Sequence, residues 1–251
     1  MKSQNPKPAR LEHPVVFASA ILAAALILFL PPTTGRAEAP QSAEDAGWTL
    51  IFSDDFDREA VGADWVVVDG DWSIKENSLR GSGTLLSAKG FPGDFPPGFL
   101  RLEFEATTDG TPTSSSADRP PEGSSVGEIS TILNAQPQDA GAPAKTGYLF
   151  QFGGMLNTVN QIQKEGVEVA SDSTPENRIV PGKKHHVVVE NDKGTVRMVI
   201  DGKVIMEEEE SESILGEGYD RVGFYFSTSS KIDNLKVYMK RLPNGLDTDD
   251  D

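Results

Sequence analysis

The feature that most constrains this chain is an alternation of apolar and polar residues, which recurs at every second position from Trp48 onward. The clearest example is residues 100–106, where apolar residues alternate with charged ones: Leu100, Leu102, Phe104 and Ala106 with Arg101, Glu103 and Glu105. Successive side chains of a strand point to opposite faces, so this pattern predicts strands with one buried and one solvated face. No segment shows the 3.6-residue period of an amphipathic helix.

Short runs of this kind lie between turn residues along most of the chain: 48–53, 65–69, 71–76, 84–88, 128–133, 148–152, 159–164, 185–190, 195–200, 222–227 and 232–239. A single twisted sheet of roughly a dozen strands would curl or split. We therefore expect an all-β fold, a two-sheet jelly-roll sandwich. Within it, residues 185–206 form a three-stranded meander, because Asp201-Gly202 is a strong hairpin signal.

The first 39 residues have the pattern of an export signal. Basic residues precede a small and apolar run at 15–30, and Ala37-Glu38-Ala39 is a typical cleavage site. The run is shorter than the roughly 20 residues that span a bilayer comfortably, although a short anchor is tolerated when the bilayer thins. We expect a secreted or periplasmic protein, with an uncleaved membrane anchor as the alternative. The expected divisions are 1–39 signal or anchor, 40–47 linker, 48–240 sandwich domain and 241–251 disordered acidic tail.

Charge and cysteine content exclude several classes of function. The chain has 23 basic and 39 acidic residues, and residues 1–39 hold four and two of these, so the mature part has 19 against 37 and a net charge of −18. Such a surface repels nucleic acid, so no nucleic-acid partner is expected. The chain has no cysteine, which excludes thiolate nucleophiles and cysteine-ligated zinc.

Two adjacent histidines, His185 and His186, are the only ones left after residues 1–39 are removed. If the strand begins at or before them, their side chains point to opposite faces and cannot both bind one metal ion. We therefore favour one inward-facing and one solvent-facing histidine over a metal pair.

A resemblance to known proteins is visible in the same region. The stretch PGKKHHVVVENDKGTVRMVIDGKVI (181–205) is similar to a strand–turn–strand segment of laminin-G-like and concanavalin A-like jelly rolls, with Lys184 where those families commonly have Trp. The similarity continues in LIFSDDFD (50–57), DWSIKENSLRG (71–81) and KIDNLKVY (231–238). The whole order resembles the 3-keto-disaccharide hydrolase domain family. This implies a concanavalin A-like sandwich and a glycosidase activity.

The resemblance also indicates where this chain departs from the family. The stretch GYLFQFGG (147–154) matches a family strand that supplies carboxylates and an amide to the groove, and Tyr148 and Gln151 correspond. The family's glutamate is replaced by Leu149, and no aspartate stands near Gly153. Glycosidic hydrolysis ordinarily needs two carboxylates, so binding is favoured over catalysis and the catalytic residues stay unknown.

The sequence therefore favours a carbohydrate-binding domain, with carbohydrate or glycoconjugate as the partner. Sugar sites combine an aromatic platform with amides and carboxylates that bond to hydroxyls. The candidate binding residues are Tyr148, Gln151, Asn134, Gln161, Gln163, His185 and Tyr225. The tyrosines alternatively are half-buried strand aromatics. The other two functions left open are the glycosidase and a structural or adhesive cell-surface module.

A structural Ca²⁺ is a further expectation. Acidic residues follow the first predicted strand and open the last, which commonly pair in concanavalin A-like folds: Asp54, Asp55, Asp57 and Asp233. Aspartates with turn carbonyls suit the six to eight oxygen ligands of calcium. The alternative is that these acids cap turns. The acidic run 207–210 is expected to mark a solvated sheet edge.

Overall fold

The computed structural model describes residue 43 and residues 46–88, 98–108, 127–137, 146–215 and 218–241. These residues form thirteen β-strands, and every pairing between them is antiparallel. The strands are β1 (Thr49–Asp54), β2 (Trp65–Val67), β3 (Asp71–Ile74), β4 (Leu79–Ser87), β5 (Gly98–Thr108), β6 (Ile129–Ala135), β7 (Tyr148–Gly153), β8 (Val159–Lys164), β9 (Val167–Asp172), β10 (His185–Asp192), β11 (Thr195–Ile200), β12 (Lys203–Glu209) and β13 (Arg221–Arg241). One helical turn, α1 (Gly154–Asn157), and one 3-10 turn, η1 (Pro175–Asn177), complete the set.

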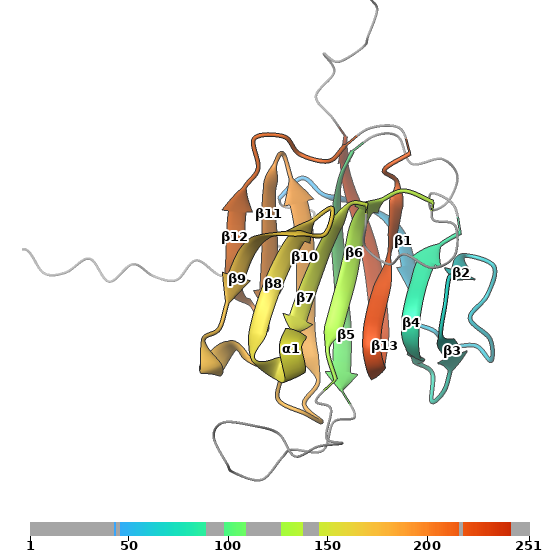
Figure 1. Cartoon of the computed structure of the whole chain (residues 1–251). Helices are drawn as coiled ribbons and strands as arrows, with labels where there is room; N and C mark the ends of the chain where they lie inside the picture. Colours follow the sequence, from blue (N-terminus) through green and yellow to red (C-terminus); the bar gives the residue numbers. More distant parts are fainter. Residues whose placement is uncertain are drawn as a thin grey trace, which may run out of the picture. The chain divides into compact units, whose positions relative to one another are not determined.

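The strands form two layers that share β13 (Figure 1). The first layer has the order β12-β11-β10-β5-β13-β1, and the second β9-β8-β7-β6-β13-β4, with β2 and β3 on the free edge of β4. The sequence predicted two strands at 222–227 and 232–239, but the structure joins them into the 21-residue β13. Its first part pairs with β4 and β6 and its last part with β5 and β1, with register shifts between them.

The core lies between the layers and follows from the alternation. In β5 the apolar set faces inward, with Leu102 and Phe104 at most 1% exposed, as the pattern predicts. Their partners across the core include Phe150 and Phe224, which are also fully buried. Burying such a side chain contributes about 1.5–3 kcal/mol each, so the two inner faces supply most of the fold's stability.

Two local features differ from the sequence prediction. Strand β9 was missed, because its apolar residue Val167 is exposed and the segment has no buried alternating face. Ala43, in the predicted linker, is buried in a small cluster with Trp48, Phe99 and Tyr238, so part of that linker belongs to the folded domain.

The predicted export signal, the predicted tail beyond Arg241 and most of the predicted linker lie outside the described residues. Within the described part, no helix has the length and apolarity needed to cross a bilayer. The strand prediction at the acidic run is confirmed, because β12 contains Glu207, Glu208 and Glu209 and lies at one end of the strand order.

Candidate functional site

The two histidines point to opposite sides of β10, as predicted. His185 is 2% exposed, whereas the side chain of His186 is half-exposed. His186 contacts Glu103 on the outer face of the first layer, with 3.1 Å between Nε2 and Oε1. The expectation of one inward and one outward histidine is confirmed.

His185 is held by bonds on both ring nitrogens. Its Nδ1 lies 3.0 Å from Asp201 Oδ2, and its Nε2 accepts the backbone N–H of Val180 at 3.2 Å. Because Nε2 accepts from Val180, Nδ1 is the nitrogen that donates to Asp201. The pKa of Asp201 is lowered to about 2: burial opposes the shift, but bonds from Lys183, the backbone N–H of His186 and His185 outweigh it. His185 therefore positions a turn and has no free nitrogen for a ligand.

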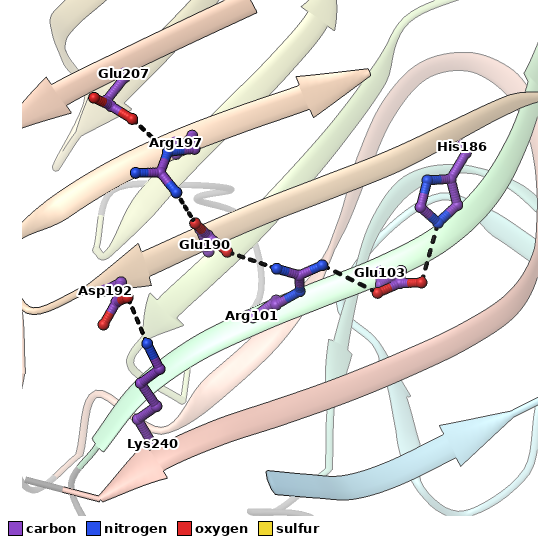
Figure 2. A network of polar contacts seen from close by, with 8 residues as sticks. All are labelled: Arg101, Glu103, His186, Glu190, Asp192, Arg197, Glu207 and Lys240. Carbon is purple, nitrogen blue, oxygen red and sulfur yellow. Dashed lines mark hydrogen bonds and ion pairs between the residues drawn. The ribbon is translucent and has the colours of Figure 1, made fainter. Parts of the chain in front are cut away.

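A chain of alternating charges crosses the outer face of the first layer (Figure 2). It runs across four strands in the order Glu207, Arg197, Glu190, Arg101, Glu103 and His186. At its centre the side chain of Glu190 is only 4% exposed and accepts from both arginines, at 3.0 and 2.7 Å. Each group has an opposite-charge neighbour, so the chain neutralises itself and is best explained as a structural network.

Two of the predicted binding residues lie in the core. Tyr148 is 0% exposed, and its hydroxyl accepts the backbone N–H of Ile214 at 3.1 Å. Asn134 is also buried, and it accepts from Asn191 Nδ2 at 3.1 Å. The expectation that these side chains converge with the others on one sheet face is wrong, because strand alternation turns Tyr148 inward when Gln151 points outward.

Four other candidates, Gln151, Gln161, Gln163 and Tyr225, come together on the outer face of the second layer, whereas His185 lies inside on β10 of the first layer. The strand register places one residue from each of six strands directly opposite the next: Thr84, Tyr225, Ser130, Gln151, Gln161 and Ser171. We call this set the polar row. Its neighbours in sequence, such as Phe150 and Phe224, face the core, so the polar row faces outward. Tyr225 and Gln151 are half-buried, and Ser171 is exposed.

A second row lies beside the polar row on the same face. Leu86, Gly223, Ile132 and Leu149 are opposite one another and continue into Gln163 and Glu168. The first four form the apolar row, and its side chains pack with Tyr225 in a separate cluster. Leu149, which replaces the family's glutamate, is therefore part of this cluster. Gln163 donates to Gln161 Oε1 at 3.3 Å, which joins the two rows.

Sequence reasoning missed the carboxylate of Glu128. It precedes β6, and its Oε2 accepts from Gln151 Nε2 at 2.7 Å while its Oε1 accepts the backbone N–H of Ser227 at 3.2 Å. The residue is 6% exposed. Its position two residues before Ser130 was the available signal, because residues two apart share a face. A second amide–carboxylate pair lies on the next two strands, β8 and β9, where Gln161 donates to Glu168 Oε2 at 2.5 Å.

The electrostatics of this face are acidic. The pKa of the Tyr225 hydroxyl is raised by burial and by the carboxylates of Glu128 and Asp69. Asp69 accepts the backbone N–H of Thr84 at 2.6 Å. The two rows contain no lysine or arginine. The face therefore offers amides, hydroxyls and carboxylates beside an aromatic ring, several of them buried. Such a set can bond to neutral hydroxyl-rich ligands and disfavours anions.

Three of the four aspartates proposed for calcium have protein partners, and the fourth, Asp57, is exposed. Asp54 accepts from both terminal nitrogens of Arg58, at 2.5 and 2.7 Å, and from Trp65 Nε1 at 3.1 Å. Its pKa is lowered, because these bonds outweigh the effect of burial. Asp55 and Asp233 cap neighbouring backbone N–H groups. Among the described residues no group of three acidic or histidine side chains is gathered as a metal site, and calcium binding stays a prediction.

The fold defines the class: the domain is an all-β jelly-roll sandwich of the galectin-like, concanavalin A-like type. Solved structures with this fold include a galectin-like Bacillus subtilis protein (TM-score 0.54, 13% identity, covering 77% of this chain and 100% of that one). The carbohydrate recognition domains of Emp47p (0.52, 16%, 77% and 97%) and Emp46p (0.54, 12%, 76% and 97%) are similar as well. These identities establish the fold alone. No family model and no curated protein matches the chain.

Proposed function

We propose that this protein is an exported carbohydrate-binding domain that binds a neutral glycan on the outer face of the second layer. The observation that carries the proposal is the polar row, in which Tyr225, Gln151 and Gln161 stand in register across adjacent strands. Tyrosine offers a flat apolar surface for a sugar ring, and the amides bond to hydroxyls on either side. The carbohydrate recognition domains that share the fold agree with this choice.

One unpaired hydroxyl adds support. Ser130 lies between Tyr225 and Gln151 in the row, and its buried Oγ has no hydrogen-bond partner among the described residues. Buried polar groups normally find a partner, and one without a partner is often completed by a ligand or water. A sugar hydroxyl placed against Tyr225 would supply that bond after the flanking side chains shift.

The test is a glycan array with the purified protein, with and without calcium, followed by calorimetry on the best sugar. Gln151→Ala should weaken binding about fivefold to tenfold, because it removes roughly one hydrogen bond. Tyr225→Phe should retain most affinity while Tyr225→Ala loses more, since stacking needs the ring. Thr195→Ala, on the first layer, is the control and should bind like the wild type. Equal binding by all four variants would refute the location.

The glycosidase of the 3-keto-disaccharide type is the second candidate. The observation that favours it is Glu128, a carboxylate bonded to Gln151 on the face where Leu149 interrupts the family's pattern. Release of product from a 3-keto-disaccharide, abolished by Glu128→Gln, would establish it. If no glycan binds and none is cleaved, while a protein partner is captured, the domain is an adhesive module.

Export is a separate part of the proposal. It rests on the basic start, the apolar run and the cleavage pattern of residues 1–39. Mass spectrometry of the cell-envelope and secreted fractions should find a mature protein that begins at Pro40. A protein that keeps residue 1 and stays with the membrane would indicate the anchor instead.

A further inference from the structure

A cavity of about 170 Å³ lies at one end of the sandwich, away from the polar row. Its walls come from β7, β10, β11 and β12 and from the segment around η1. Phe152 lines it, two positions from the core side chain Phe150 and on the opposite face of β7 from Gln151. Because the cavity and the polar row use opposite faces of the same strand, they are two separate sites.

Arg178, which follows η1, is the unusual residue of this cavity. Its Nε is buried and has no hydrogen-bond partner among the described residues, and no carboxylate there forms an ion pair with it. The other arginines with described side chains all have a carboxylate partner: Arg58, Arg80, Arg101, Arg197 and Arg221. In a chain with 39 acidic and 23 basic residues, an arginine without a carboxylate is conspicuous.

The other charges around the cavity do not compensate Arg178. Lys183 pairs with Asp201 at 2.7 Å, and the Asp201 carboxylate also accepts bonds from His185 and from the backbone N–H of His186. These partners neutralise the charge of Asp201, so it does not pair with Arg178. Lys203 donates to the neutral amide of Asn177 at 2.7 Å. The one remaining acid at the rim, Glu176, is exposed to solvent. The cavity therefore carries an excess of positive charge in an acidic protein.

The rest of the lining is apolar. Phe152, Ile200 and Ile205 form part of the wall, and Phe152 packs edge-on against the His185 ring at 5.2 Å between centroids. A dry cavity of about 150 Å³ holds a molecule of the size of benzene. A guanidinium presents its donors as a planar fork that matches a carboxylate. The complementary ligand has one carboxylate and a small apolar body.

We propose that this cavity is a binding site for a small organic carboxylate. The Arg178 guanidinium donates to the carboxylate, and the apolar body of the ligand packs against Phe152 and Ile205. The site is independent of the glycan-binding face, and its ligand has the opposite chemical preference, since the polar row disfavours anions.

The test is calorimetry with benzoate as the probe. Saturable binding by the wild type is expected, with affinity reduced about tenfold or more in Arg178→Met, because bonds to charged groups are among the stronger ones. Arg80→Met is the matched control and should bind benzoate normally. Benzyl alcohol, which has the same ring without the charge, should bind at least tenfold more weakly. Inorganic phosphate distinguishes the alternatives: binding as tight as that of benzoate would overturn the carboxylate assignment.

An NMR measurement on the wild type tests the proposal without relying on a variant that must fold correctly. Benzoate should shift the amide of Val180 and the ring protons of His185 and Phe152, which border the cavity. Shifts confined to other regions, or no saturable change at millimolar benzoate, would overturn the proposal. Glycan binding should be unchanged in Arg178→Met. A negative result with benzoate would therefore leave the proposed glycan binding untouched, and a negative glycan array would leave the carboxylate site untouched.

Discussion

Replacing Glu190 by glutamine should destabilise the domain by about 3 kcal/mol. The carboxylate is almost fully buried, and it accepts from Arg101 and Arg197 at 3.0 and 2.7 Å (Figure 2). Removing one partner of a buried charge pair costs roughly 3–5 kcal/mol. The loss is smaller here because Arg101 keeps Glu103 and Arg197 keeps Glu207. Urea unfolding measures the free energy directly, and for a domain of this size the change corresponds to about 6–12 °C in Tm.

The control for this prediction is Glu209→Gln. Glu209 lies on the edge strand β12, is exposed and opposes Thr195 in the register. Its replacement should change the free energy of unfolding by less than about 0.5 kcal/mol. If Glu190→Gln were equally harmless, the explanation of the charged chain as a structural network would be refuted, and this face would need a functional explanation.

Three further predictions concern other parts of the fold. The bond to Glu103 raises the pKa of His186 above 6.5, and bonds from His186 and Arg101 lower that of Glu103 to about 2. The stabilisation by the His186–Glu103 pair is therefore complete between about pH 4.5 and 6.5, is lost toward pH 2, and is lost again as the pH rises from 6.5 through the raised pKa of His186. In His186→Gln, urea unfolding at several pH values should therefore show a smaller loss of stability above pH 6.5 than in the wild type, and an unchanged pH dependence would contradict the assignment. Gly223→Val should destabilise by at least about 2 kcal/mol, because a Cβ there would lie 2.1 Å from Leu85 O; a melting temperature equal to that of wild type would show that the strand shifts freely. Calorimetry with Ca²⁺ should detect binding at the aspartates near Asp54. An absence of heat, together with a melting temperature that chelator does not change, would refute the calcium prediction.

The alternation of residue types predicted the faces of individual strands well. Leu102 and Phe104 point into the core and Arg101 and Glu103 point out, as the pattern requires. The same logic placed the two histidines on opposite faces, and the structure shows that His185 is the inner one and His186 the outer one. These outcomes were predictable because the two-residue period of a strand is a local property, and burying the apolar face dominates the energy.

Pairing between distant strands was not predictable in the same way. The two halves of β13 were expected as separate strands because polar residues separate their apolar runs, yet the chain stays extended through the crossing between layers. The hydrogen bond between Glu128 and Gln151 joins residues 23 positions apart. Its existence depends on the register of β6 with β7, which local composition does not encode.

The turn at α1 shows a further limit of local rules. Met155, Leu156 and Asn157 all adopt left-handed backbone angles, with φ of 49, 61 and 63°, a conformation that costs non-glycine residues roughly 1–2 kcal/mol each. The turn is held by Asn157, whose amide exchanges two bonds with the backbone of Ile179, at 2.8 and 2.9 Å. Tertiary contacts 22 residues away therefore outweigh the local preference.

The candidate site follows from register more than from motif. The family-like segment at 147–154 attracts attention to Tyr148, but Tyr148 is one residue from Leu149 and three from Gln151, and these odd spacings send it to the other face of the sheet. What defines the site is that Gln151 meets Ser130 and Gln161 across two neighbouring strands. A shift of one residue in either pairing would turn Gln151 against a core side chain and dissolve the polar row. The proposed sugar recognition therefore depends on the same strand pairings that hold the core together.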